Sequence, residues 1–155
     1  MEAKDLRIGN LVTDEFYDSF KTIIEVESLN DKGINLEIED DGNYPECAER
    51  WIEPYYRLDQ LLGIPLTEEW LLKFGFKYNE EDEAFQDKII HIENRDGDRY
   101  LPPHIKERLE GCFGVWFNSS ASMLIQDVKY VHQLQNLYFA LTNKELTLAD
   151  STPQR

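Results

Sequence analysis

Residues 63–76 read GIPLTEEWLLKFGF, and this stretch predicts a short helix with defined ends. Thr67 is placed as the N-cap, because its hydroxyl can accept a hydrogen bond from a free amide of the first turn. Leu66 and Leu71 have the spacing of a hydrophobic staple. Gly75 is placed as the left-handed residue that ends the helix, with Phe76 able to fold back on Leu71. This helix divides the chain near its middle, so each side can be considered separately.

The chain before this helix has the pattern of short β-strands. Ile34, Leu36 and Ile38 alternate with polar residues and share one side of a predicted strand. Less regular strand patterns lie at 6–14, 20–29 and 50–56, and the pair Gly9-Asn10 predicts a turn or a bulge. Several short strands separated by turns are typical of a small barrel. Residues 1–63 are therefore predicted to form a small SH3-like, β-barrel-like unit.

The chain after the helix predicts a short antiparallel sheet and a final helix. Strand patterns lie at 88–94 and 112–118, followed by a further strand at 123–126. The pair Asp96-Gly97 predicts a hairpin between residues 88–94 and residues 99–101. In 112–118, Phe113, Val115 and Phe117 are expected on one face, with Cys112, Gly114 and Trp116 on the other. The fold class is α+β, with a second unit at 64–148 and a flexible tail at 149–155.

The final helix is expected from about residue 128, and its polar flank has two interpretations. Its apolar stripe consists of Val131, Leu134, Leu137, Tyr138 and Leu141. His132, Gln135 and Phe139 lie on the flank of that stripe. If Phe139 is exposed, these three residues are the candidate partner surface. If Phe139 is buried against the N-terminal unit, the stretch is a core helix that clamps the two units together, and this second interpretation is favoured.

The charge of the chain limits the classes of partner. The sequence has 31 acidic and 16 basic residues and a net charge of −15, which disfavours nucleic acids and anionic membranes as ligands. Residues 1–63 contain 16 acidic and 6 basic residues, and the remainder contains 15 and 10. No apolar run is long enough to span a bilayer, and the first residues do not have the pattern of a signal peptide. The expected location is the cytoplasm, with no membrane association.

Sequence motifs for chemistry are missing, so no catalytic residue, cofactor site or metal site is predicted. Cys47 and Cys112 have no zinc-site spacing and are expected to be free thiols. The turns around Gly42 and Gly97 lack the ligand spacing of a calcium loop. Whether either cysteine pairs with a histidine in space, as a nucleophilic dyad needs, stays open.

Three segments give the chain a resemblance to a known group of proteins. DLRIGNLV at 5–12, IPLTEEWLLKFGF at 64–76 and YVHQLQNLYFALTNKEL at 130–146 resemble an uncharacterised family of short bacterial and prophage proteins. The resemblance implies no activity, cofactor or site residue, and it favours an accessory or phage-related role. That family usually has a glycine where this chain has Asn143. Asparagine also tolerates the left-handed conformation, so the helix is expected to end there.

Three functional hypotheses follow from these features. The first is a non-catalytic protein-interaction or accessory binding module with an unknown protein partner. The second is an acidic DNA mimic that inhibits a nucleic-acid enzyme, based on the charge of residues 1–63. The third is an enzyme of unrecognised type, which needs a polar pocket with a perturbed cysteine or histidine.

Overall fold

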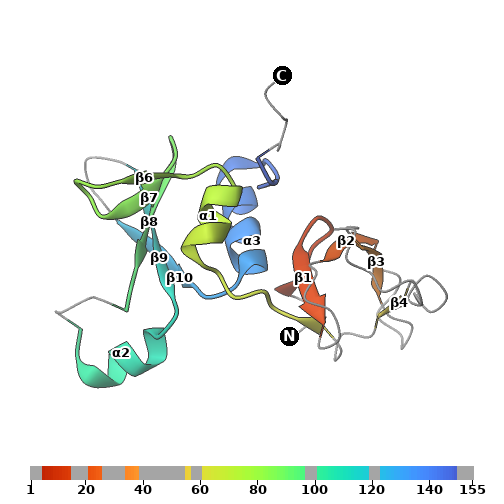
Figure 1. Ribbon diagram of the computed structural model, residues 1–155, viewed down its shortest axis with the longest axis horizontal. Helices are drawn as coiled ribbons and strands as arrows, with labels where there is room; N and C mark the ends of the chain where they lie inside the picture. Colours follow the sequence, from red (N-terminus) through yellow and green to blue (C-terminus); the bar gives the residue numbers. More distant parts are fainter. Residues whose placement is uncertain are drawn as a thin grey trace. The chain divides into compact units, whose positions relative to one another are not determined.

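The computed structural model of the protein describes residues 5–14, 21–25, 34–38, 55–56, 61–96, 101–118 and 123–149 (Figure 1). Within these residues the fold is mixed α and β, as predicted, with antiparallel sheets and three helices. The chain forms two compact units. The first comprises Met1–Ile64 and Tyr130–Glu145, and the second comprises Pro65–Lys129 and Leu146–Arg155.

The first unit contains a five-stranded antiparallel sheet and the helix α3 (Val131–Thr142). The strands are β1 (Leu11–Asp14), β2 (Lys21–Glu25), β3 (Ile34–Ile38), β4 (Tyr55–Tyr56) and β5 (Leu61–Leu62). Their order is β4-β3-β2-β1-β5, so the first strand lies between the second and the fifth. Among the described residues no pairing of β4 with β5 closes this sheet into a barrel.

The predicted turn at Gly9-Asn10 is confirmed. Gly9 has a φ of 88°, a conformation that glycine adopts without steric cost. Its N–H donates to the carbonyl of Ile23 at 2.7 Å, and the N–H of Ile23 donates to the carbonyl of Asn10 at 3.0 Å. The turn therefore fixes the start of β1 against β2, above a core of Leu6, Val12, Ile23 and Leu61.

The second unit begins with the helix that residues 63–76 predict. Helix α1 (Glu68–Lys73) has Thr67 as its N-cap, with the hydroxyl accepting from the Trp70 N–H. At its end the Gly75 N–H donates to Leu72 and the Phe76 N–H donates to Leu71, which is the Schellman arrangement. Gly75 has a φ of 85°. Both predicted ends of the helix are confirmed.

A second five-stranded antiparallel sheet follows in sequential order. Its strands are β6 (Lys77–Asn79), β7 (Ala84–Gln86), β8 (Ile90–Asn94), β9 (Phe113–Phe117) and β10 (Leu124–Val128). One face of the sheet is the core of the unit and holds the buried residues Phe85, Ile90, Ile92, Phe113, Val115 and Val128. The opposite face carries His91 and Trp116, which are direct partners across β8 and β9. The two predicted faces of residues 112–118 are thus confirmed.

Three sequence-based expectations differ from the structure. Strand β8 pairs with β7 and β9 rather than with the strand predicted at 99–101, of which residues 99 and 100 lie outside the described residues. Helix α2 (Pro103–Leu109) comes next in the chain. Pro103 at the first helical position is a common helix start, and this signal was missed. The final helix was assigned to the second unit, whereas its contacts lie with β1 in the first. Ala149, placed in the flexible tail, donates a backbone hydrogen bond to Lys73.

Candidate functional site

Helix α3 is oriented by its two ends and by its apolar stripe. The side chain of Gln133 accepts a hydrogen bond from the Tyr130 N–H at the first turn. The helix ends at Asn143, which has a left-handed φ of 55°, so the predicted helix stop is confirmed. Val131 and Leu134 are fully buried. The polar flank of the helix is therefore held in a fixed position within the first unit.

The flank His132, Gln135 and Phe139 does not form an exposed surface. His132 is 3% exposed and Gln135 is 2% exposed. Phe139 is partly exposed, and the guanidinium of Arg7 lies 3.7 Å from the centre of its ring. The burial of His132 and Gln135 agrees with the interpretation of the stretch as a core helix. It leaves no free face on which these three side chains could meet a partner together.

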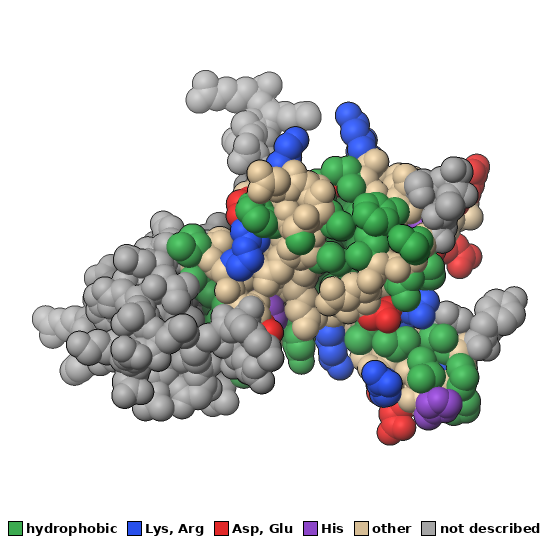
Figure 2. Space-filling view, turned by 180° about the vertical axis from the view of Figure 1, so that it is seen from behind, with side chains coloured by type: hydrophobic (Ala, Val, Ile, Leu, Met, Phe, Trp, Pro, Cys, Tyr) green, Lys and Arg blue, Asp and Glu red, His purple; other side chains and the backbone are tan. Residues whose placement is uncertain are grey.

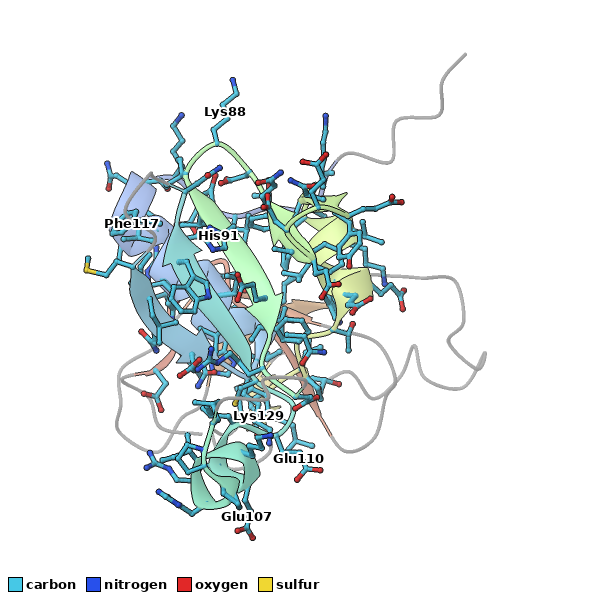
Figure 3. The ribbon with its side chains drawn as sticks, turned by 90° about the vertical axis from the view of Figure 1, so that its left-hand side faces the viewer. Lys88, His91, Glu107, Glu110, Phe117 and Lys129 are labelled. Carbon is cyan, nitrogen blue, oxygen red and sulfur yellow. The ribbon has the colours of Figure 1, made fainter. Side chains whose placement is uncertain are left out.

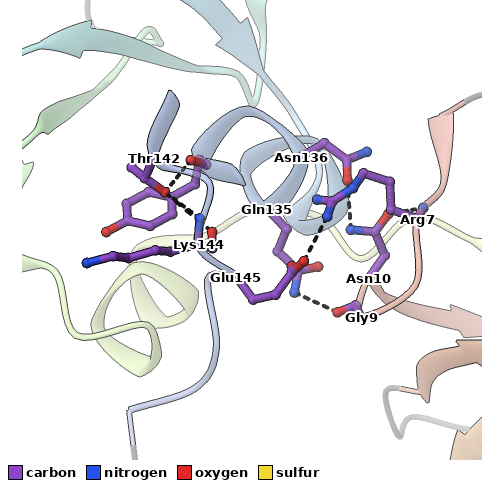
Figure 4. A network of polar contacts seen from close by, with 9 residues as sticks. Arg7, Gly9, Asn10, Gln135, Asn136, Thr142, Lys144 and Glu145 are labelled. Carbon is purple, nitrogen blue, oxygen red and sulfur yellow. Dashed lines mark hydrogen bonds and ion pairs between the residues drawn. The ribbon is translucent and has the colours of Figure 1, made fainter. Parts of the chain in front are cut away.

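Gln135 attaches α3 to the backbone at the start of β1. Its Oε1 accepts from the Leu11 N–H at 2.8 Å. Its Nε2 donates to the Gly9 carbonyl at 3.1 Å, as Figure 4 shows. One side-chain amide thus pairs with a backbone donor and a backbone acceptor, as a residue of a neighbouring strand would. This contact explains why an amide occupies a buried position on the helix.

Asn136 and Asn10 extend this network. Asn10 is fully buried and donates to Asn136 Oδ1 at 2.9 Å, while its own Oδ1 accepts from the Arg7 N–H at 2.7 Å. Asn136 donates to the carbonyl of Asp5 at 2.7 Å. Asn10, Gln135 and Asn136 are called the α3 joint below. Because the buried amides of Asn10 and Gln135 are used in these contacts, the α3 joint holds the helix in place, and we assign it no role in catalysis or ligand binding.

Arg7 and His132 lie beside the α3 joint. Arg7 forms an ion pair with Glu145 at 2.7 Å in addition to its contact with Phe139. The ring of His132 stacks on Tyr130, with centroids 5.7 Å apart and planes 10° apart. Burial lowers the pKa of His132; Asp5 opposes this shift, and the amino terminus adds to it. His132 is therefore held as a neutral imidazole.

The second sheet presents a polar and aromatic face that sequence analysis did not assign to a function. On β8 and β9 the rings of His91 and Trp116 are nearly parallel, with planes 4° apart and centroids 6.0 Å apart. Arg95 lies 5.8 Å from the centre of the Trp116 ring and forms an ion pair with Asp127 at 3.2 Å. The cross-strand pairs of β8, β9 and β10 place all these side chains on one face. This Trp116 face consists of His91, Glu93, Arg95, Gly114, Trp116, Leu124 and Asp127.

Gly114 determines how closely the Trp116 face packs. A Cβ atom at this position would lie 2.9 Å from Arg95 Cδ, 3.1 Å from Trp116 Nε1 and 3.4 Å from Leu124 Cδ1. The indole Nε1 is buried, and within the described part of the chain no hydrogen-bond acceptor reaches it. The glycine therefore lets the side chains of Arg95, Trp116 and Leu124 converge over β9.

The surroundings of the Trp116 face carry both signs of charge. Figure 3 shows His91 near the middle of the sheet and Lys88 at the turn between β7 and β8. Glu107, Glu110 and Lys129 gather at the opposite end, and Lys129 Nζ donates to the carbonyl of Glu110 at 3.1 Å. In Figure 2 hydrophobic side chains gather over the second unit, with charged side chains of both signs at their margin.

The chemistry left open by the sequence is partly resolved. Cys112 is buried, and burial raises the pKa of its thiol; Lys129 opposes the shift, while Asp127 and Asp96 add to it. A thiol held protonated is a poor nucleophile, and no histidine is among the groups that act on it. Cys47 lies outside the described residues. Those residues contain no cluster of three metal-ligating side chains.

None of the described helices combines the length and apolar character needed to cross a bilayer. Comparisons with protein-family models, with curated proteins and with solved structures gave no match to this chain.

The Trp116 face was missed because a single sequence gives no strand register. Alternation placed Gly114 and Trp116 on one side of their strand, but it could not show that His91, Arg95 and Asp127 lie beside them. The available signal was a glycine between two aromatic residues in a strand, which marks a close approach of another group.

Proposed function

We propose that this protein is a non-catalytic interaction module that binds a protein partner through the Trp116 face. The observation that carries the proposal is the stacked row of His91, Trp116 and Arg95 on the face of the sheet opposite the core. Tryptophan and arginine are the residues that most often dominate the energy of protein interfaces. The side chains of His91 and Arg95 are 17% and 10% exposed, so contact with a partner would fall mainly on the partly exposed Trp116 and its neighbour Leu124.

The unpaired indole of Trp116 supports this proposal. A buried N–H without an acceptor costs about 1–3 kcal/mol. The flexible stem of Arg95 lies beside this N–H over Gly114. A partner that displaces the stem of Arg95 from Gly114 and offers a carbonyl oxygen would satisfy the indole N–H.

The neighbouring side chains extend the face with apolar surface. Leu124 is 36% exposed and Met123 is 62% exposed, and both belong to the same end of the sheet as Trp116. Of these two residues, Leu124 is the one that pairs with Trp116 across β9 and β10, so it is the exposed apolar side chain that extends the Trp116 face. Glu93 and Asp127 provide polar atoms at the rim of this face.

The segments that carry the family resemblance are used in structural contacts, which also favours this assignment. Residues 5–12 and 130–146 meet in the α3 joint, and residues 64–76 form α1 with its two caps. Their side chains are therefore explained by folding. A binding role is more readily supplied by the Trp116 face, which lies outside all three segments, and an accessory or phage-related role is compatible with it.

We also propose that the first unit is an SH3-like barrel. Its antiparallel order β4-β3-β2-β1-β5, with the first strand between the second and the fifth, supports this assignment. Nuclear Overhauser contacts that close the sheet would support it further, whereas an open five-stranded sheet in solution would contradict it.

The acidic DNA mimic is a less supported alternative. In the second unit acidic and basic side chains are interspersed, as in the pairs Glu69–Lys73 and Arg95–Asp127, and this pattern does not resemble a continuous phosphate-like surface. Most acidic residues of the first 63 lie outside the described residues. The alternative predicts salt-sensitive binding to a basic nucleic-acid enzyme.

The proposed function is tested by quantitative affinity purification from the native cells with three baits. The wild type is compared with Trp116→Ala and with Tyr78→Ala, which removes an aromatic side chain that is 50% exposed on β6 of the same sheet. We expect a set of proteins whose recovery falls at least tenfold with the Trp116→Ala bait and is unchanged with the Tyr78→Ala bait. If all three baits recover the same proteins equally and both variants are folded, the Trp116 face is not the binding surface.

A further inference from the structure

Helix α3 carries a buried histidine whose surroundings suit only its neutral form. His132 is 3% exposed, and its Nδ1 has no hydrogen-bond partner among the described residues. A Cβ atom at Gly63 would lie 2.8 Å from the Tyr130 ring and 3.0 Å from His132 Cε1. The imidazole thus packs closely against the Tyr130 ring and the Gly63 backbone.

Protonation would change the hydrogen-bonding needs of this ring. A neutral imidazole has one donor and one acceptor nitrogen, whereas an imidazolium has two donors. The buried Nδ1 would then carry a proton without an acceptor, and a charge would be placed where solvent cannot reach it. Both effects oppose protonation while the helix stays in place.

The charged groups around His132 do not reverse this balance. The N-terminal segment contributes Asp5, which favours the imidazolium, and Arg7, which is already paired with Glu145. The segment Leu61–Ile64 has no charged residue, and on α3 itself the neighbouring side chains Gln133, Gln135 and Asn136 are neutral. The amino terminus disfavours the imidazolium. Burial is the largest of these effects and sets the pKa of His132 below its ordinary value of 6.5.

The position of His132 connects it to the α3 joint. Gln135 and Asn136 follow it by three and four residues, so all three side chains lie on neighbouring positions of the helix surface. Asn136 donates to the carbonyl of Asp5, the residue whose carboxylate acts on His132. A movement of the helix that admits water to His132 therefore also stretches the hydrogen bonds of the joint.

We infer that protonation of His132 loosens α3 from residues Asp5–Leu11, so that the α3 joint is an acid-sensitive contact built into the first unit. The contact has its full strength above the ordinary pKa of histidine, because both the docked and the released ring are then neutral. It weakens as the pH falls below that value, where the released ring binds a proton and the docked ring does not. This inference does not depend on the proposed function.

Hydrogen exchange tests the inference directly. The readout is the protection factor of the Leu11 N–H, which donates a hydrogen bond to Gln135 Oε1. It is measured from about pH 7.5 to about pH 5 and corrected for intrinsic exchange. We expect it to fall in acid by about tenfold for each unit by which the pKa is lowered, while amides of β8 and β9 keep their protection. In His132→Phe, which keeps the stacked ring but cannot titrate, the fall should vanish. In His104→Gln, a change at an exposed histidine on α2, it should remain.

An NMR titration of the wild type keeps the test independent of whether the variant folds. The Cε1–H signal of His132 should titrate below 6.5, and the loss of Leu11 protection should follow the same curve. A His132 that titrates at or above its ordinary value would overturn the inference. So would a Leu11 protection factor that is independent of pH or that falls equally in His132→Phe.

Discussion

At the scale of single residues, the first unit depends on amide side chains that form hydrogen bonds with backbone N–H and carbonyl groups. Gln135 pairs with the Leu11 N–H and the Gly9 carbonyl, and the fully buried Asn10 joins Asn136 to Arg7. The sequence showed an amide-rich helix flank and favoured its interpretation as part of a core helix. It could not show that a turn more than 120 residues earlier supplies the partners, because such contacts depend on tertiary structure alone.

Replacement of Gln135 by alanine should destabilise the first unit. The buried Leu11 N–H would lose its acceptor and the Gly9 carbonyl its donor, so we expect a loss of about 3 kcal/mol in the free energy of unfolding. Urea titration followed by circular dichroism measures it. Gln126→Ala, at an exposed glutamine on β10, serves as the control and should change stability by less than about 0.5 kcal/mol. Equal effects of the two changes would show that the amide is not structural.

Gly114→Ala should disturb the Trp116 face while leaving the core side of the sheet intact. The added methyl group meets Arg95 and the indole, and overpacking of this kind costs about 1–3 kcal/mol. The NMR signal of the Trp116 indole N–H should shift, whereas that of Trp70 on α1 should stay in place and serves as an internal control. An unchanged Trp116 signal would show that the glycine does not set the packing of the face.

At the scale of elements, the sequence predicted best where the signals are local. Helix α1 has its cap, staple and terminating glycine within ten residues of each other, so its ends were predicted from neighbours in the chain. Helix α2 has no side-chain cap and only Pro103 as a signal, and the turn residues before it favoured a hairpin instead. The assignment of α3 to a unit and the Trp116 face depend on contacts between distant segments, which no local pattern encodes.

The end of α3 offers a test of this element-scale account. Asn143 holds a φ of 55°, a left-handed conformation that favours glycine. Asn143→Gly should keep or slightly raise the free energy of unfolding, because glycine adopts this conformation without steric cost. Asn143→Ala should lower it by about 1 kcal/mol, since alanine is strained there. The same urea titration measures both variants, and a more stable alanine variant would contradict the account.

At the scale of the whole molecule, two compact units have different characters. The first holds a buried polar joint with an acid-sensitive histidine, and the second holds a two-faced sheet whose outer face stacks an imidazole, an indole and a guanidinium. Cys112 is buried, with a raised thiol pKa. The proposed recognition role is assigned to the sheet of the second unit because that sheet carries the stacked row of side chains.

Site-specific photocrosslinking in the native cells tests the proposed interface most directly. A photoreactive phenylalanine analogue replaces Leu124, which is 36% exposed beside Trp116, or Leu72, which is 55% exposed on α1. The account predicts a discrete crosslinked partner from position 124 that disappears when Trp116→Ala is added, and none from position 72. A partner captured from position 72 and not from position 124 would contradict it.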